Sequence, residues 1–172
     1  MRKMLAVFIA TFMLVATSAH AAGLTWTLND WTYSDGATGS GSFDYDASTD
    51  MFSNILINVS GGSEPDRVYN TIGSASSAQS LFFFEGSFAD FTGETSLAAS
   101  LSSAMTNAGG VIPALIFTNL GEQACLDATC TTGSLVRAQT SGSISAIPLP
   151  ASVLLLGSAL LGLGLLRRRQ TA

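Results

Sequence analysis

Residues 42–59 read Ser-Phe-Asp-Tyr-Asp-Ala-Ser-Thr-Asp-Met-Phe-Ser-Asn-Ile-Leu-Ile-Asn-Val, and this stretch gives the clearest indication of secondary structure in the chain. Phe43 and Tyr45 alternate with polar residues, the turn-forming Ala-Ser-Thr-Asp follows, and apolar residues then recur at every second position. The residues on that second apolar face are Ile55, Ile57 and Val59. Because successive side chains of a strand point to opposite faces, the pattern predicts a β-hairpin over Ser42–Val59.

The segments on either side of this hairpin have the same character. Short apolar runs alternate with Gly, Ser, Thr, Asn and Asp, which indicates strands joined by frequent turns. Further strands are expected at Leu24–Tyr33, Arg67–Ile72, Leu81–Phe84, Ile112–Thr118 and Ser134–Ile144. We therefore predict an all-β fold, a small β-sandwich of jelly-roll-like form, over residues 22–146.

Two segments of this domain fit structures other than a simple strand. Ser96–Ala108 has apolar residues at helical spacing, so a short helix and a strand followed by a loop both fit it. Gly142–Ala146 consists of small residues and is interpreted as a flexible connector to the C-terminal segment.

The N-terminus has the features of a signal peptide. Arg2 and Lys3 precede an apolar stretch that continues to Ala16 and is too short for a comfortable membrane span. Ala19 and Ala21 then supply the small residues that a signal peptidase accepts. We expect residues 1–21 to be removed by cleavage after Ala21.

The C-terminal segment, residues 147–172, is predicted to carry a short membrane anchor. Its motif consists of Pro148, Leu149, Pro150 and Ala151, and its basic cluster consists of Arg167, Arg168 and Arg169. Between them, residues 151–166 carry no charge and predict a short transmembrane helix of about 21–24 Å at roughly 1.5 Å per residue. The arginines should stay cytoplasmic, which places the middle domain outside the cytoplasm.

The charge of the middle domain excludes several classes of function. Between positions 22 and 146 lie all twelve acidic residues and only two basic ones, Arg67 and Arg137, a formal charge of −10. Such a domain repels nucleic acid, so no nucleic-acid partner is expected. The single histidine, His20, lies in the signal peptide, so catalysis or zinc binding through imidazole is excluded from the mature chain.

Three groups of side chains are candidate sites. Cys125 and Cys130 are close in sequence in an exported chain, which favours a local disulfide over a metal or redox pair. The candidate calcium ligands are Asp44, Asp46 and Asp50, although the residues that would complete a calcium loop are missing and a solvated strand and turn explain them more simply. The candidate catalytic carboxylates are Glu85, Asp90 and Glu94, whose spacing alone does not bring them together.

Aromatic residues allow a further hypothesis. Most of them are expected to pack in the core, and the alternative is a platform on which sugar rings stack. The residues concerned are Trp26, Trp31, Tyr33, Phe82, Phe83, Phe84, Phe88 and Phe91.

The C-terminal segment resembles a known sorting signal. Pro-Leu-Pro-Ala at positions 148–151, a short apolar helix and the arginine cluster at 167–169 are similar to the VPLPA-CTERM variety of the PEP-CTERM signal, with Ile147 in place of the usual valine. Residues 41–59 also resemble a hairpin found in the variable domains that carry such tails. The resemblance implies processing by an exosortase, a membrane-embedded cysteine transpeptidase-like enzyme, in Gram-negative bacteria that make exopolysaccharide.

These observations together predict a non-enzymatic surface or extracellular-matrix protein without a cofactor. Its expected partners are the exosortase, the inner membrane and exopolysaccharide, and its expected location is the periplasmic side of the inner membrane and then the cell surface or the extracellular matrix. Three alternatives stay open: a carbohydrate- or calcium-binding module, a hydrolase that uses carboxylates alone, and a GPI-anchored protein, against which the terminal arginines argue.

Overall fold

The structure is a computed structural model that describes residues 23–86 and 89–147. Within these ranges the fold is all-β, as expected. The strands are β1 Leu24–Tyr33, β2 Thr38–Asp46, β3 Met51–Ser60, β4 Arg67–Tyr69, β5 Thr71–Ile72, β6 Ser80–Phe84, β7 Thr95–Leu101, β8 Gly110–Leu115, β9 Gly121–Cys125 and β10 Gly133–Ala146. In this part of the chain no helix has the length and apolar character needed to cross a membrane, and the predicted helix at 151–166 lies outside it.

The predicted hairpin over Ser42–Val59 is confirmed. β2 and β3 pair antiparallel, with Tyr45 opposite Phe52 and Gly41 opposite Ile57. Ile57 and Val59 are fully buried, whereas Leu56, on the other face, is exposed. The alternation of the sequence therefore reports correctly which face of the hairpin meets the core.

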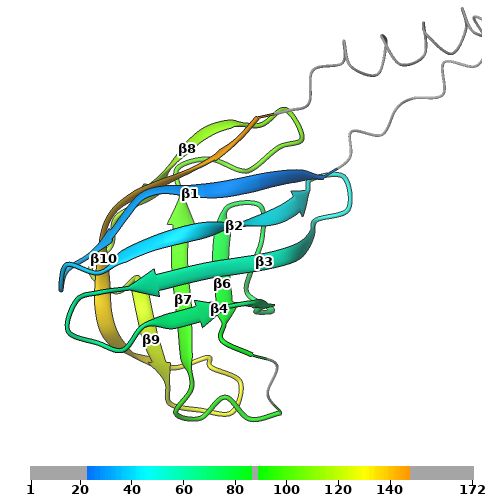
Figure 1. The fold of residues 1–172 in the computed structure, drawn as a ribbon. Coiled ribbons are helices and arrows are strands. Elements are labelled where there is room, and N and C mark those ends of the chain that lie inside the picture. Colours follow the sequence, from blue (N-terminus) through cyan, green and yellow to red (C-terminus); the bar gives the residue numbers. More distant parts are fainter. Residues whose placement is uncertain (1–22, 87–88, 148–172) are drawn as a thin grey trace, which may run out of the picture.

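The strands form two layers that cross each other. β4, β3, β2, β1, β10 and β8 follow one another in the first layer, and β5, β6 and β7 continue the same hydrogen-bonded path, with β9 between β7 and β10. Figure 1 shows β1, β2 and β3 running from side to side in front of β6, β7 and β9, which run from top to bottom of the view. Such crossing is typical of sheets whose corners are made by strands that belong to both layers.

Two segments make these corners. The first half of β10 pairs with β9 and its second half pairs with β8, so one strand serves both layers. The segment predicted as one strand at Arg67–Ile72 is divided at Asn70, since β4 pairs with β3 and β5 pairs with β6. Sequence periodicity finds both segments but gives no sign that they change partners.

The helical alternative for Ser96–Ala108 is wrong. Residues 95–101 form β7, which is buried on both faces and pairs with β6 over five residues. Leu97 and Leu101 belong to this strand, and Met105 follows in a loop with its side chain buried. Their spacing imitates a helix because a strand and a loop residue contribute to one core.

The core between the layers is rich in aromatic side chains. The ring centroids of Phe43 on β2 and Phe83 on β6 are 5.3 Å apart, which joins the two layers directly. The Trp31 side chain fits the first layer because glycines lie beside it on both adjacent strands, Gly39 on β2 and Gly142 on β10. A Cβ at Gly39 would lie 2.8 Å from the Trp31 side chain, and one at Gly142 would lie 2.6 Å from it. Gly142 therefore belongs to the core packing.

Candidate functional site

The end of β10 leads directly to the predicted sorting motif. Ser143, Ile144, Ser145 and Ala146 pair with β8, and the first three of them also pair with β1 on the other side. Ile144 is fully buried, and Ile147, the next residue after the strand, is 89% exposed. The expectation of a flexible connector at Gly142–Ala146 is therefore wrong, because its small residues pack as the centre of a sheet.

The two ends of the described chain leave the domain together. β1 begins at Leu24, opposite Tyr45, and β10 runs antiparallel to β1 and ends at Ala146. Figure 1 shows the start of β1 and the end of β10 at the same side of the molecule. We name this side the tail end: Leu24, residues 46–51 of the β2–β3 turn, residues 106–111, and Ile147.

Most of the predicted targeting residues lie outside the described ranges. This applies to the cleavage-site residues Ala19 and Ala21, to the motif Pro148–Ala151 and to the cluster Arg167–Arg169. The structure therefore bears on the targeting hypothesis only through the place where the described chain begins and ends.

The three candidate calcium ligands have separate hydrogen-bond partners. Asp44 accepts from the Thr25 hydroxyl at 2.6 Å and from the Asn54 amide at 2.6 Å, and Asp50 accepts from the Tyr45 hydroxyl at 2.7 Å. Among residues 23–86 and 89–147 no group of three or more His, Cys, Asp or Glu side chains is placed to hold a metal ion.

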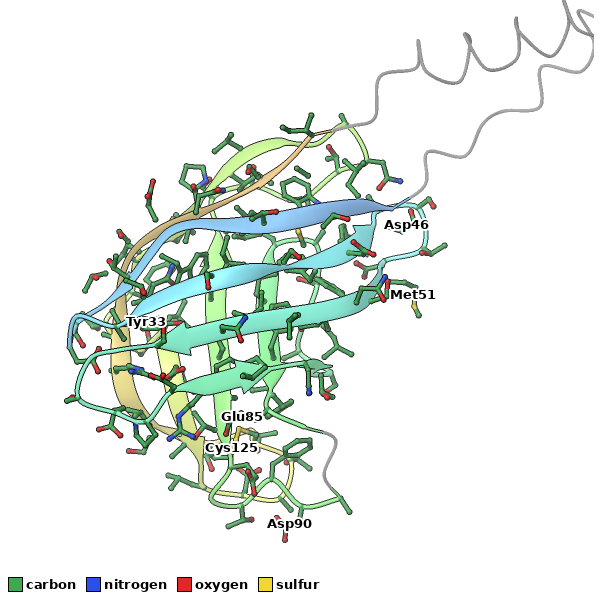
Figure 2. The ribbon with its side chains drawn as sticks, viewed as in Figure 1. Tyr33, Asp46, Met51, Glu85, Asp90 and Cys125 are labelled. Atoms are coloured by element: carbon green, nitrogen blue, oxygen red, sulfur yellow. A yellow bond between two sulfur atoms is a disulfide. The ribbon has the colours of Figure 1, made fainter. Side chains whose placement is uncertain are left out.

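Asp46 ties two loops together at the tail end. Its Oδ1 accepts from the Ser48 hydroxyl at 2.6 Å and from the Asn107 amide at 3.0 Å, and these bonds lower the pKa of Asp46 to about 2. The backbone N–H of Ala47 donates in turn to the side-chain oxygen of Asn107 at 2.9 Å. Figure 2 shows Asp46 and Met51 close together at this end.

A buried cluster of charges lies away from the tail end, between the two layers. The Glu122 carboxylate is fully buried on β9, where it accepts from the hydroxyl of Tyr69 at 2.6 Å and from Nε of Arg137. Arg137, on β10, is 2% exposed, and its guanidinium carbon lies 5.4 Å from the centre of the Tyr33 ring. We name the residues Asp35, Arg67, Tyr69, Glu122 and Arg137 the ionic cluster.

Arg137 also binds the loops of the first layer. Its Nη1 donates to Asp35 Oδ2 and to the carbonyl of Gly61, each at 3.2 Å, and its Nη2 donates to the carbonyl of Pro65 at 3.2 Å. Burial of a guanidinium costs free energy unless its donors are paired, and these partners satisfy that condition. The cluster therefore holds β10 and β9 to the loops that surround β4.

Burial and charge shift the pKa values of the groups around the cluster. Burial opposes the ionised form of Asp35, but hydrogen bonds from the Ala37 and Ser63 backbone N–H groups and the Arg137 guanidinium outweigh it and lower its pKa to about 2. Burial, reinforced by the Glu122 carboxylate, raises the pKa of Tyr69 well above its usual value. At neutral pH the Asp35 carboxyl is therefore ionised and Tyr69 is a neutral phenol.

Both arginines of the domain are used inside this cluster. Arg67 donates to Glu85 at 3.1 Å and lies 4.0 Å from Glu122, and Arg137 pairs with Glu122 and Asp35. The other nine acidic side chains between 22 and 146 have no arginine or lysine of the same segment left to neutralise them. The sequence gives the charge of −10, but only the structure shows that its few cations face inward.

The predicted disulfide is confirmed, and hydrogen bonds to Asp127 hold the same loop closed. Cys125 and Cys130 are bonded to each other. The Asp127 carboxylate accepts from the hydroxyls of Thr129, Thr131 and Thr132 and from their backbone N–H groups, at 2.6–3.0 Å. These bonds hold the pKa of Asp127 well below its usual range, the largest contribution coming from Thr132.

The carboxylates considered for hydrolysis have different surroundings. Glu85 pairs with Arg67, as described above, whereas Asp90 accepts from the backbone N–H of Thr92 at 2.8 Å. Glu94 lies in the turn before β7, where its carbonyl accepts from the backbone N–H of Cys125 at 2.8 Å. Figure 2 shows Glu85 and Asp90 at separate places in the lower part of the molecule.

The expectation that most of the candidate aromatic residues pack in the core is confirmed, and the alternative of a sugar-stacking platform is wrong for four of them. Trp26, Trp31 and Tyr33 are all buried, as is Phe83, so their rings contact the core and present no face for a sugar. Phe84 stacks on Phe91, with centroids 4.0 Å apart, beneath the disulfide loop. Phe88 lies outside the described ranges.

Comparisons with protein-family models, with curated proteins and with solved structures find no match for this chain.

Proposed function

We propose that this chain is an exported, non-enzymatic surface or extracellular-matrix protein that an exosortase-type enzyme sorts through the C-terminal segment. The observation that carries the proposal is the order of Pro148–Ala151, an uncharged stretch and Arg167–Arg169 at the end of the chain. This order resembles the PEP-CTERM signal, and a short apolar helix followed by cations is retained in a membrane with the cations on the cytoplasmic side.

The arrangement of the domain supports this proposal. Its first and last strands begin and end at one side, the tail end, so the two predicted targeting segments continue from the same side of the body. Its cations are turned inward, which leaves an acidic exterior that favours solubility outside the cell and disfavours nucleic acid. We propose its association with exopolysaccharide on the family resemblance alone.

We also propose that the two crossing layers are a small β-sandwich of jelly-roll-like form. β10, which pairs with strands of both layers, supports this classification. The domain is then a compact body carried to the surface by the tail.

The test is the mass of the mature protein made in a Gram-negative host that contains an exosortase. The proposal expects a chain that starts near Ala22 and ends within positions 148–151, without Arg167–Arg169. Replacing both Pro148 and Pro150 by alanine should leave the tail attached. The matched control is Pro65→Ala, in an exposed loop of the domain, which should be processed as the natural chain is. A mature protein that retains Arg169 in the natural chain would overturn the proposal.

A further inference from the structure

Only one residue separates the folded sheet from the sorting motif. Ala146 is paired with Gly110 of β8 and is buried, and Pro148 begins the motif two positions later. Ile147 is thus the entire spacer between the two. A domain that ended in a flexible stalk would separate the sheet from the motif by several residues, whereas here the paired residue Ala146 is two positions before Pro148.

Residues before the motif are held from both sides. Ser143, Ile144 and Ser145 pair with Pro113, Ile112 and Val111 on β8, and the same three residues pair with Asn29, Leu28 and Thr27 on β1. Ile144 is fully buried between the layers, where Leu28 and Ile112 belong to the same core. The backbone that leads to the motif therefore has no free edge.

An enzyme that cuts near the motif must bind chain on both sides of the bond. Peptides bound by enzymes are generally extended, and three extended residues span about 10 Å. A binding site that holds three residues before Pro148 needs Ser145, Ala146 and Ile147. Two of these belong to β10, so the folded domain and the enzyme compete for the same backbone.

We propose that the end of β10 must separate from β1 and β8 before the tail can be processed, so that the fold itself limits the rate of sorting. This inference rests on the proposed function. An enzyme that binds only the opened form works on the fraction of molecules that are open, and its rate falls in proportion to that fraction.

Three features limit how strongly this end of β10 is held. Ile144 is the only large side chain among Ser143–Ala146, and Pro113, opposite Ser143, has no N–H to donate to the sheet. The β8–β10 pairing extends over four residues only. The first half of β10, by contrast, is fixed through Arg137, so opening should stop before it reaches the ionic cluster.

The test measures the rate at which the full chain loses its tail, by pulse–chase labelling in the exosortase-containing host. One variant carries Gly-Ser-Gly-Ser between Ile147 and Pro148, which moves the motif away from an unchanged sheet. A second carries Ile144→Ala, which weakens the end of β10 at the natural length. The matched control is Leu135→Ala, in the other half of the same strand, where the side chain is 41% exposed.

We expect the insertion to raise the rate roughly tenfold or more, Ile144→Ala to raise it by a similar factor, and Leu135→Ala to leave it unchanged, because only the first two increase access to the motif. If the natural chain and the insertion variant are processed equally fast, the limiting role of β10 is overturned while sorting stands. If neither loses its tail, the proposed function itself is overturned.

Discussion

The two halves of β10 are stabilised in different ways. The first half, Gly133–Ala138, pairs with β9 and carries Arg137, whose guanidinium binds two carboxylates and two carbonyls between the layers. The second half, Ser143–Ala146, pairs with β8 and contributes Ile144 as its one large buried side chain. The domain therefore fixes the half of the strand far from the tail by charge and closes the half beside the tail by modest apolar packing.

Loss of the Glu122 carboxylate should have the largest effect on stability, and it tests whether charge pairing holds the first half of β10. Glu122→Ala leaves the buried Arg137 guanidinium without its main partner, and we expect the free energy of unfolding to fall by about 4 kcal/mol. Urea titration of the variant and of the natural chain measures this loss. The control is Glu85→Ala, which removes a partly exposed partner of Arg67 and should cost less than about 1 kcal/mol. Equal losses would show that the burial of Glu122 is not what matters.

Truncation in the second half should have the next largest effect. Ile144→Ala removes a fully buried side chain from the end of β10, and we expect a loss of about 3 kcal/mol. Amide hydrogen exchange should accelerate most at Ser143 and Ser145, beside the tail, and little at Arg137. Uniform acceleration along β10 would contradict a division of the strand into two independently held halves.

The disulfide gives a further test of the difference between the two halves of β10, because it lies near the first half and not near the tail end. Replacing both Cys125 and Cys130 by serine should lower the free energy of unfolding by about 2 kcal/mol, since the ring that it closes is short. Thermal melting compared with the natural chain measures the loss. Exchange should increase in residues 126–131 and stay unchanged at the tail end. A change at Ile144 would show that the two ends are coupled.

Acid should affect both ends through different carboxylates, with the smallest effects. The pKa values of Asp35 and Asp46 are each lowered to about 2 from 3.8, so the stability that they contribute is present above about pH 4 and is lost as pH falls toward 2. Urea midpoints measured from pH 5 to pH 2 should fall less steeply in Asp35→Asn and in Asp46→Asn than in the natural chain. A steeper fall in either variant would reverse the sign expected from the lowered pKa values.

Sequence reasoning found much of the fold because alternation is a local property. The hairpin and β1 follow from apolar residues at every second position, and most of β6, β8 and β10 follow from short segments bounded by turn residues. The disulfide follows from two nearby cysteines in a chain predicted to be exported. It did not find β9, whose Glu122 and Gln123 read as polar loop residues. Glu122 can be buried because it pairs with Arg137. The two residues are fifteen positions apart, so no local sequence pattern indicates the pair.

The sequence by itself determined the class of the fold, the net charge and the hypothesis of two targeting segments, because these depend on composition and on short-range order. The three-dimensional fold was needed to show that Gly142–Ala146 is part of the sheet and not a connector, that Glu122 is buried on a strand, and that both arginines pair within the ionic cluster. Each of these depends on which strands become neighbours, and neighbours in a sheet are chosen by packing across the whole domain and not by the residues beside them in the chain.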